Sequence, residues 1–295
     1  MKISIKATIS LISFFILFSA FHNPFNNDPN KYLNQGKSYY HQKQYIKAIG
    51  EFTMALSIQD NLAEAYYYRG LSKDLHGKEN GYYNPDFCYD LISAMKYGFP
   101  NAIKQLYERG LFEAVQLNYT VDNPESVLCV ELVNHQISSF PESIDKMTQL
   151  ISINLNNNKI KAIDTDFCTH HPNLIALNLS QNYIEKVPEE LDELQYLYEL
   201  NLSQNKIKEL PHSIYKLTHL SKLNLRGNHI SHISHQISEL KSLKVLNLSL
   251  NQLTKIPKEF YDMKNLETLD LSGNLIPDKE IEKLKLELGS THIIH

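Results

Sequence analysis

From position 127 to position 276 the chain repeats one arrangement of apolar and polar positions. Each unit has apolar residues at its first, fourth and sixth positions, and in six of the seven units an Asn follows three residues after the sixth. The apolar residues at the fourth and sixth positions flank a polar one, and this alternation predicts a short strand buried on one face. The Asn lies where the chain has to turn, and an amide there can satisfy backbone groups locally. The first positions of the seven units are 23 or 24 residues apart: Val127, Leu150, Leu174, Leu197, Leu220, Leu243 and Leu266.

The second half of each unit has apolar residues at helical spacing, as in Leu191 and Leu194, and predicts a short helix or loose turn that returns the chain. Seven copies in register resemble the leucine-rich repeat family in its plain 23-residue form. The resemblance implies an α/β solenoid over residues 127–276: a horseshoe with a parallel concave sheet and an asparagine ladder inside it. The ladder positions are Asn158, Asn182, Asn205, Asn228, Asn251 and Asn274. The first unit has His135 at this position, as expected of a terminal repeat.

Both ends of a solenoid need a cover. Residues 113–126 are predicted to form an N-terminal cap, and residues 277–295 a C-terminal one. The C-terminal helix is expected to begin at Pro277 and to stop at Gly289. Its apolar face would consist of Ile281, Leu284 and Leu288, and the tail after it would add a last strand.

A second pattern precedes the first. Gly36 and Tyr39 are followed by Ala48, Phe52 and Ala55, and Gly70 lies 34 residues after Gly36. The spacing resembles tetratricopeptide repeats, whose period is about 34 residues. Residues 29–112 therefore predict a small all-α region of about two and a half such repeats, with a third helix over residues 101–109.

The first 21 residues have another composition. Lys2 and Lys6 precede an apolar run from Ala7 to Phe21, which is the arrangement of a secretory signal peptide. The run is shorter than the roughly 20 apolar residues of a membrane span. Residues 1–21 thus predict export to an extracytoplasmic location, secreted, periplasmic or on the surface. An uncleaved anchor is the alternative, and it is the one way in which the sequence predicts a membrane contact.

Charge and cysteine content narrow the range of functions. The net charge is −4, with 29 basic and 33 acidic side chains, so the chain has no excess of positive charge for binding nucleic acid. Cys88, Cys129 and Cys168 are widely spaced and form no C-x-x-C pair, so neither a zinc site nor a disulfide framework is predicted. We expect all three to fill space as small apolar residues.

No nucleotide-binding loop, metalloprotease motif or nucleophile elbow is present, so the sequence predicts no enzyme, cofactor or metal site. His229, His232 and His235 are spaced by three, but they fall in the turn of one repeat and are expected to be solvated. Cys88-Tyr89-Asp90 resembles the C-x-D motif of bacterial ubiquitin ligases that also carry leucine-rich repeats. Those proteins place it in a separate catalytic domain that this chain does not contain, so a ligase-like effector is the third alternative.

The concave sheet is the predicted binding surface. Three columns of strand positions are expected to face solvent, running from Cys129 to Thr268, from Glu131 to Asp270 and from Val133 to Ser272. At their centre lie Glu199, Asn201, Lys222, Asn224 and Arg226, where opposite charges are beside amides. We therefore predict a bacterial-type, non-enzymatic scaffold that holds a protein or peptide on these five residues. An intracellular or membrane-anchored signalling adaptor is the alternative function, and consensus filler without a partner is the alternative role of the Asn and Ser side chains.

Overall fold

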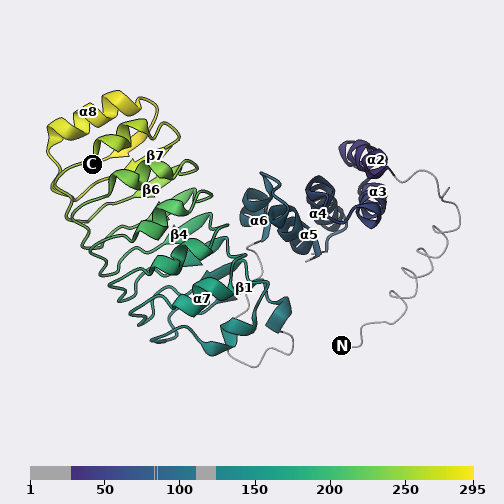
Figure 1. The fold of residues 1–295 in the computed structure, drawn as a ribbon, viewed down its shortest axis with the longest axis horizontal. Coiled ribbons are helices and arrows are strands. Elements are labelled where there is room, and N and C mark those ends of the chain that lie inside the picture. Colours follow the sequence, from purple (N-terminus) through teal and green to yellow (C-terminus); the bar gives the residue numbers. More distant parts are fainter. Residues whose placement is uncertain (1–27, 83, 85, 111–123) are drawn as a thin grey trace, which may run out of the picture. The chain divides into compact units, whose positions relative to one another are not determined.

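A computed structural model describes residues 28–82, 84, 86–110 and 124–295 (Figure 1). The described residues divide into two compact units, one ending at Phe99 and the other beginning at Pro100. The predicted signal segment 1–21 lies outside the described residues, as does most of the predicted N-terminal cap.

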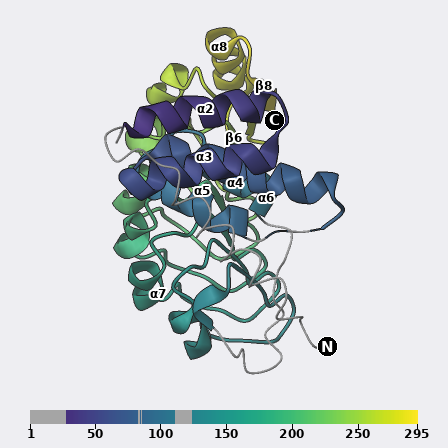
Figure 2. The ribbon, with the colours of Figure 1, turned by 90° about the vertical axis from the view of Figure 1, so that its right-hand side faces the viewer.

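The first unit is all-helical, which confirms the predicted helical region. Asp28 caps its first helix by accepting a hydrogen bond from Asn30 N at 2.9 Å, and Pro29 occupies the first helical position. Figure 2 shows the first two helices lying side by side. The helices are α2 (Pro29–His41), α3 (Tyr45–Ile58), α4 (Ala63–Glu79) and α5 (Asp86–Lys96).

Two glycines bring these helices close together. A Cβ at Gly36 would lie 2.6 Å from the ring of Phe52, and one at Gly70 would lie 3.0 Å from the carbonyl oxygen of Phe87. Hydrogen alone fits at Gly36, because real Cβ atoms do not approach other atoms so closely. Each of the two glycines, 34 residues apart, thus lies where its helix packs closely against the next helix.

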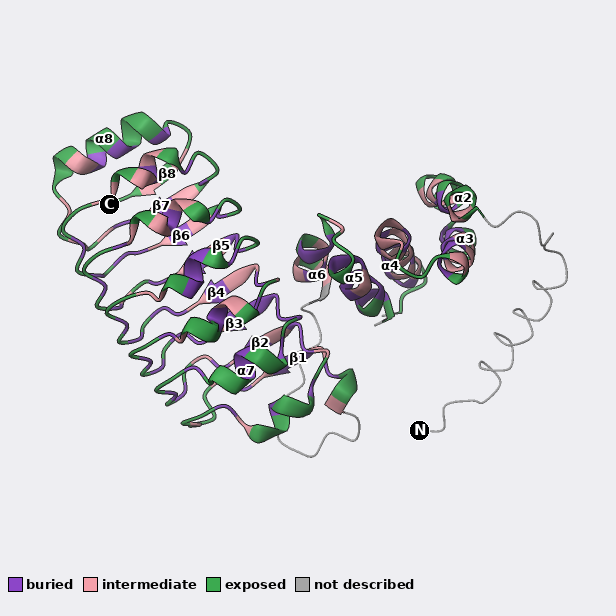
Figure 3. Cartoon of the chain, viewed as in Figure 1, coloured by how far each residue is buried: buried purple, intermediate pink, exposed green. Residues whose placement is uncertain are grey.

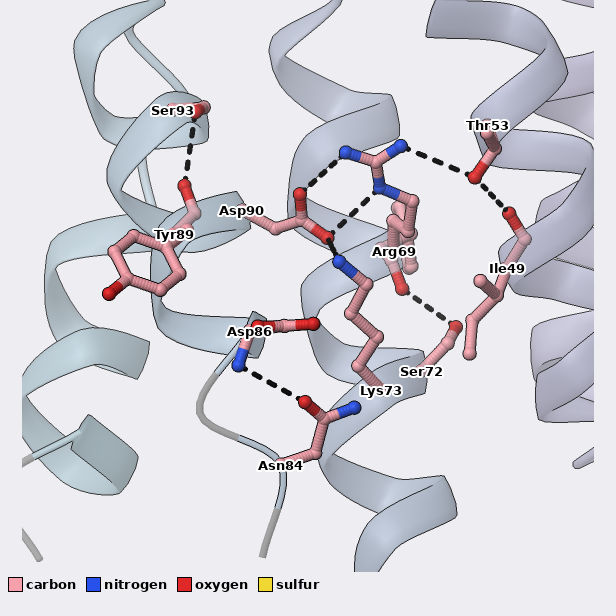
Figure 4. Close-up of polar contacts among 11 residues, drawn as sticks. Ile49, Thr53, Arg69, Ser72, Lys73, Asn84, Asp86, Tyr89, Asp90 and Ser93 are labelled. Carbon is pink, nitrogen blue, oxygen red and sulfur yellow. Dashed lines mark hydrogen bonds and ion pairs between the residues drawn. The ribbon is translucent and has the colours of Figure 1, made fainter. Parts of the chain in front are cut away.

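A buried carboxylate joins α4 to α5 (Figure 4). Asp90 pairs with Arg69 through Nη2 at 2.6 Å and Nε at 3.0 Å, and with Lys73 Nζ at 2.8 Å. Arg69 Nη1 also donates to Thr53 Oγ1 at 3.2 Å, which links α3 to the pair. The side chain of Asp90 is 5% exposed, so its charge is stabilised mainly by these two cations.

The second unit contains an eight-stranded parallel sheet in which the strands follow chain order. The register is the predicted one: Glu199 pairs with Lys222, and Asn201 with Asn224. The solenoid with a parallel sheet is thus confirmed (Figure 1). Its strands are β1 (Cys129–Glu131), β2 (Ser152–Asn154), β3 (Ala176–Asn178), β4 (Glu199–Asn201), β5 (Lys222–Asn224), β6 (Val245–Asn247), β7 (Thr268–Asp270) and β8 (His292–Ile294).

The chain returns between strands through short 3-10 turns and one α-helix. The helix α7 (Thr165–His170) belongs to the repeat that is 24 residues long, and His171 follows it. The buried ring of His171 has Nδ1 2.9 Å from Phe167 O and Nε2 3.0 Å from Ile144 O, so it ties α7 to the preceding repeat. The 3-10 turns are η1 (Pro124–Ser126), η2 (Glu142–Lys146), η3 (Glu189–Glu193), η4 (His212–Lys216), η5 (His235–Glu239) and η6 (Lys258–Asp262).

The asparagine ladder predicted from the resemblance is present in the interior. Asn205 Nδ2 donates to Leu179 O at 2.9 Å and to Leu202 O at 3.0 Å, while its Oδ1 accepts from Ile184 N at 2.9 Å. Each ladder Asn therefore satisfies backbone groups of its own repeat and of the preceding one. His135 does not replace it in the first unit, because its side chain is exposed and only its backbone N–H reaches the ladder, at Asn158 Oδ1.

The C-terminal segment forms a helix and a last strand. The helix α8 (Asp278–Leu288) has both buried and exposed residues (Figure 3). Ile281, Leu284 and Leu288 are buried in the core of the repeats, whereas Leu286 is 84% exposed. Gly289 ends the helix at a positive φ of 39°, a conformation that favours glycine. The strand β8 then pairs with β7 and completes the sheet.

No helix in the described part of the chain is both long and apolar enough to cross a bilayer.

Candidate functional site

The structure brings the five predicted binding residues together at the middle of the concave sheet. Glu199 and Asn201 lie on β4, their register partners Lys222 and Asn224 lie on β5, and Arg226 follows two residues after β5. Arg226 is exposed and the other four side chains are half-buried. Their role in binding stays a prediction.

The two asparagines at this place are already hydrogen-bonded. Asn201 Oδ1 accepts from Ser203 N at 3.1 Å and from Ser203 Oγ at 2.8 Å, and Asn224 Oδ1 accepts from Arg226 N at 3.1 Å. These bonds orient each carboxamide and hold the start of the turn after the strand. What remains for a ligand is mainly the amide NH2 group of each side chain.

Part of the predicted solvent-facing surface is buried, and the prediction was wrong at these positions. Ser180, Ser203 and Ser249 point back to the Asn two residues earlier, with Oγ–Oδ1 distances of 2.6–2.8 Å. Each serine hydroxyl lies against that Asn, and side chains of the neighbouring repeat also contact it, as Arg226 contacts Ser249 and Asn156 contacts Ser180. Cys129 and Ala176 are buried as well, because they are short side chains on the floor of a hollow. The exposed polar area of the sheet is therefore narrower than predicted.

A tyrosine that the sequence analysis did not place contacts the centre of the site. Tyr107 lies on α6 (Ala102–Gly110), which belongs to the second unit. Its Oη donates to Glu199 Oε2 and accepts a hydrogen bond from Lys222 Nζ at 3.0 Å. Lys222 Nζ lies 4.6 Å from the centroid of the Tyr107 ring. The centroids of the Tyr107 and Tyr198 rings are 4.8 Å apart. Glu199 and Lys222 also face each other at 3.7 Å.

The charges of this cluster are coupled. Burial raises the pKa of Tyr107, and the hydrogen bond to Glu199 raises it further, so its phenol stays protonated at neutral pH. For Lys222, burial lowers the pKa, but the hydrogen bond to Tyr107 and the charge of Glu199 help to outweigh it and place the pKa above its ordinary value. The cluster therefore presents one anion, one cation and one neutral hydroxyl.

Two hollows of the second unit flank the cluster. One, of about 220 Å³, lies over β1 to β4 and is lined by Tyr107, Glu131, Asn154, Asn178 and Glu199 among others. The other, of about 650 Å³, lies at the starts of the later strands. Its charged lining consists of Lys104, Lys241, Lys244, Lys264 and Glu267. Both are open and polar enough for a peptide, and neither has the enclosed apolar form of a small-molecule site.

The other constellations noted in the sequence show no arrangement for chemistry. Cys88 is fully buried, and Asp90 is bound to Arg69 and Lys73. Burial raises the pKa of the Cys168 thiol to about 12. All three cysteines are buried. His229, His232 and His235 are exposed, and no three metal-binding side chains of the described residues come together.

Comparison with known proteins agrees with the geometry of the second unit. The leucine-rich repeat model matches residues 148–207, 172–230 and 218–276. Residues 148–276 are leucine-rich repeats. Human leucine-rich repeat-containing protein 20 is 30% identical over 100 residues, which is 32% of this chain and 53% of that protein.

Solved leucine-rich repeat structures share the fold. A protein from Leptospira interrogans is 28% identical with a TM-score of 0.51, over 61% of this chain and 52% of its own. An internalin from Listeria monocytogenes is 23% identical with a TM-score of 0.51, over 60% and 54% of the two chains. The chain spans about half the length of each of these relatives, so the similarity concerns the repeats.

Proposed function

We propose that this chain is a non-enzymatic scaffold that holds a protein or peptide on the concave face of its leucine-rich repeats. The observation that carries the proposal is the group of opposite charges and oriented amides at the centre of the sheet: Glu199, Asn201, Lys222, Asn224 and Arg226. Leucine-rich repeats commonly mediate protein binding, and a solenoid offers an extended concave surface for it.

The site is held rigidly, which favours binding. The ladder below the sheet fixes the backbone directly after β4 and β5, where Asn228 Nδ2 donates to Leu202 O and Leu225 O. Asn201 and Asn224 are oriented by the bonds to Ser203 and Arg226. Arg226 Nη1 donates to Ser249 Oγ at 3.0 Å, so its guanidinium is positioned before a partner arrives. A preorganised side chain loses less conformational entropy on binding, and Arg is enriched among interface hot spots.

The finer parts of the proposal rest on sequence. Lys2, Lys6 and the apolar run to Phe21 support export, with a membrane-anchored or intracellular adaptor as the alternative. The 34-residue spacing of Gly36 and Gly70 supports tetratricopeptide-like repeats in the first unit. The low charge supports the absence of a nucleic-acid partner.

Site-specific photocrosslinking in the native host tests the proposal. A photoreactive amino acid is placed at Arg226 in one full-length variant and at Lys208 in another. Lys208 is exposed on the loop between β4 and η4 and serves as a control outside the sheet. We expect one defined protein adduct from the Arg226 position and none from the Lys208 position. The same adduct from both positions, or from the Lys208 position alone, would contradict concave-face binding.

A further inference from the structure

The hydroxyl and the ring of Tyr107 each have complementary partners in the cluster around them. Glu199 accepts a hydrogen bond from the hydroxyl group, and Lys222 donates one to the hydroxyl oxygen at 3.0 Å, so the hydroxyl has both an acceptor and a donor. Lys222 Nζ also lies over the ring at 4.6 Å, and the ring of Tyr198 packs beside it at 4.8 Å and 39°. A cation above an aromatic face and a tilted aromatic pair are both favourable contacts.

Other side chains fit this subsite less well. A phenylalanine would fill the ring position but would leave Glu199 and Lys222 without the hydroxyl that joins them. A basic side chain would approach Lys222, and an acidic one would approach Glu199, each with repulsion of like charges. The chemistry of the three residues therefore selects tyrosine.

We propose that Tyr198, Glu199 and Lys222 form a tyrosine-recognition subsite, which Tyr107 occupies in the free chain and into which the protein partner inserts a tyrosine of its own. This inference rests on the proposed function, because it names the residue by which a partner is recognised on the concave face. The partner and α6 then compete for the same three side chains.

The contact that α6 makes is of the kind that a partner can displace. The helix has nine residues, and helices of this length have little stability of their own in water. Glu199 and Lys222 are 32% and 41% exposed, so each hydrogen bond to Tyr107 is partly offset by solvation. When a covalently tethered group occupies the site, the apparent affinity for a partner is the intrinsic affinity multiplied by the fraction of molecules in which the site is vacant.

Peptide binding tests the proposal. The probe is a fluorescent, helix-stapled peptide of residues 100–110, made with Tyr or Phe at position 107 and titrated into the full-length chain. We expect Tyr107→Ala, which vacates the subsite, to bind the Tyr peptide at least about fivefold more tightly than the unchanged chain. On Tyr107→Ala, the Tyr peptide should bind about 5- to 10-fold more tightly than the Phe peptide, since charged groups strengthen the hydroxyl's hydrogen bonds. Adding Lys222→Ala should abolish this preference, whereas adding Lys208→Ala should preserve it.

A second measurement needs no peptide. The rate of Lys222 acylation by an amine reagent, read by mass spectrometry, should rise about threefold in Tyr107→Ala, while that of Lys208 stays constant. Equal binding of the Tyr and Phe peptides, no binding up to millimolar concentration, or unchanged Lys222 acylation would each overturn the proposal. Neither assay contains the partner, so a failure of concave-face binding in the crosslinking experiment is distinguishable from a failure of the tyrosine subsite.

Discussion

The helical unit and the leucine-rich repeats stabilise their buried polar groups in different ways. In the repeats the groups are neutral amides that bind backbone, as Asn205 binds Leu179 O, Leu202 O and Ile184 N. In the helical unit a buried carboxylate, Asp90, binds two cations from a neighbouring helix. Throughout the described residues, no buried side-chain nitrogen or oxygen atom is left without a partner.

The difference determines which substitutions destabilise each unit most. The polar interior of the repeats is distributed, because each ladder Asn serves its own repeat and the one before it. The helical unit buries two carboxylates, Asp74 and Asp90, and one of them, Asp90, compensates both Arg69 and Lys73. Loss of one group should therefore cost more in the helical unit than in the repeats.

The largest effect is expected from Asp90→Ala. It leaves Arg69 and Lys73, whose side chains are only 17% and 20% exposed, without their anion. Removing one partner of a buried pair costs about 3–5 kcal/mol, and the partial exposure reduces this to roughly 2–4 kcal/mol of the free energy of unfolding. Urea unfolding of the full chain followed by circular dichroism measures it. Asp60→Ala, on the exposed loop between α3 and α4, is the control and should stay within about 0.5 kcal/mol.

The second effect is expected from Asn205→Ala in the ladder. It leaves Ile184 N buried without its acceptor, whereas Leu179 O and Leu202 O each lose one of two amide donors and keep Asn182 and Asn228. We therefore expect a loss of about 1–3 kcal/mol in the free energy of unfolding. The same urea titration measures it. A loss as large as that of Asp90→Ala would remove the distinction between concentrated and distributed polar interiors.

Asn201→Ala should lower the free energy of unfolding less than Asn205→Ala does. Asn201 is on the strand of the same repeat, outside the ladder. It removes one acceptor for Ser203 N and Ser203 Oγ in a half-buried position, for which we expect about 1 kcal/mol. The midpoint of unfolding should lie between those of the unchanged chain and Asn205→Ala. Equal midpoints for Asn201→Ala and Asn205→Ala would contradict the different roles of the two columns.

The last prediction concerns the ionisation of Cys168, which should not change the free energy of unfolding at neutral pH. Burial, followed by nearby acidic groups, raises the pKa of its thiol from 9.0 to about 12 in the folded chain. Because the unfolded thiol ionises first, this contribution to stability is fully present below pH 9 and is lost as the pH rises towards 12. The free energy of unfolding of the unchanged chain should thus fall more steeply than that of Cys168→Ala from pH 9 to 12, with no difference in slope from pH 7 to 8. Parallel curves over the whole range would contradict a buried thiol.

The sequence predicted those features that repeat at a fixed spacing. The strands, their register and the helix with Ile281, Leu284 and Leu288 follow from local periodicity, and the ladder around Asn205 follows from the resemblance to leucine-rich repeats. The burial of Ser203 was missed, because an alternating pattern predicts the face of a side chain but not the hydrogen bond that holds its hydroxyl against Asn201. The contact of Tyr107 with Glu199 joins residues 92 positions apart in different elements, and the pairing of Arg69 with Asp90 depends on which helix faces meet. Neither has a signal in the spacing of the sequence.

Whether the centre of the concave sheet is the binding site is tested most directly by calorimetric titration of the crosslinked partner, once it is identified. The unchanged chain is compared with Arg226→Ala, and with Lys208→Ala as the control outside the sheet. We expect Arg226→Ala to weaken binding about 5- to 30-fold, corresponding to about 1–2 kcal/mol, with an unchanged melting temperature. Lys208→Ala should bind like the unchanged chain. Undiminished affinity of Arg226→Ala together with weaker binding of Lys208→Ala would place the partner on another face and contradict the account.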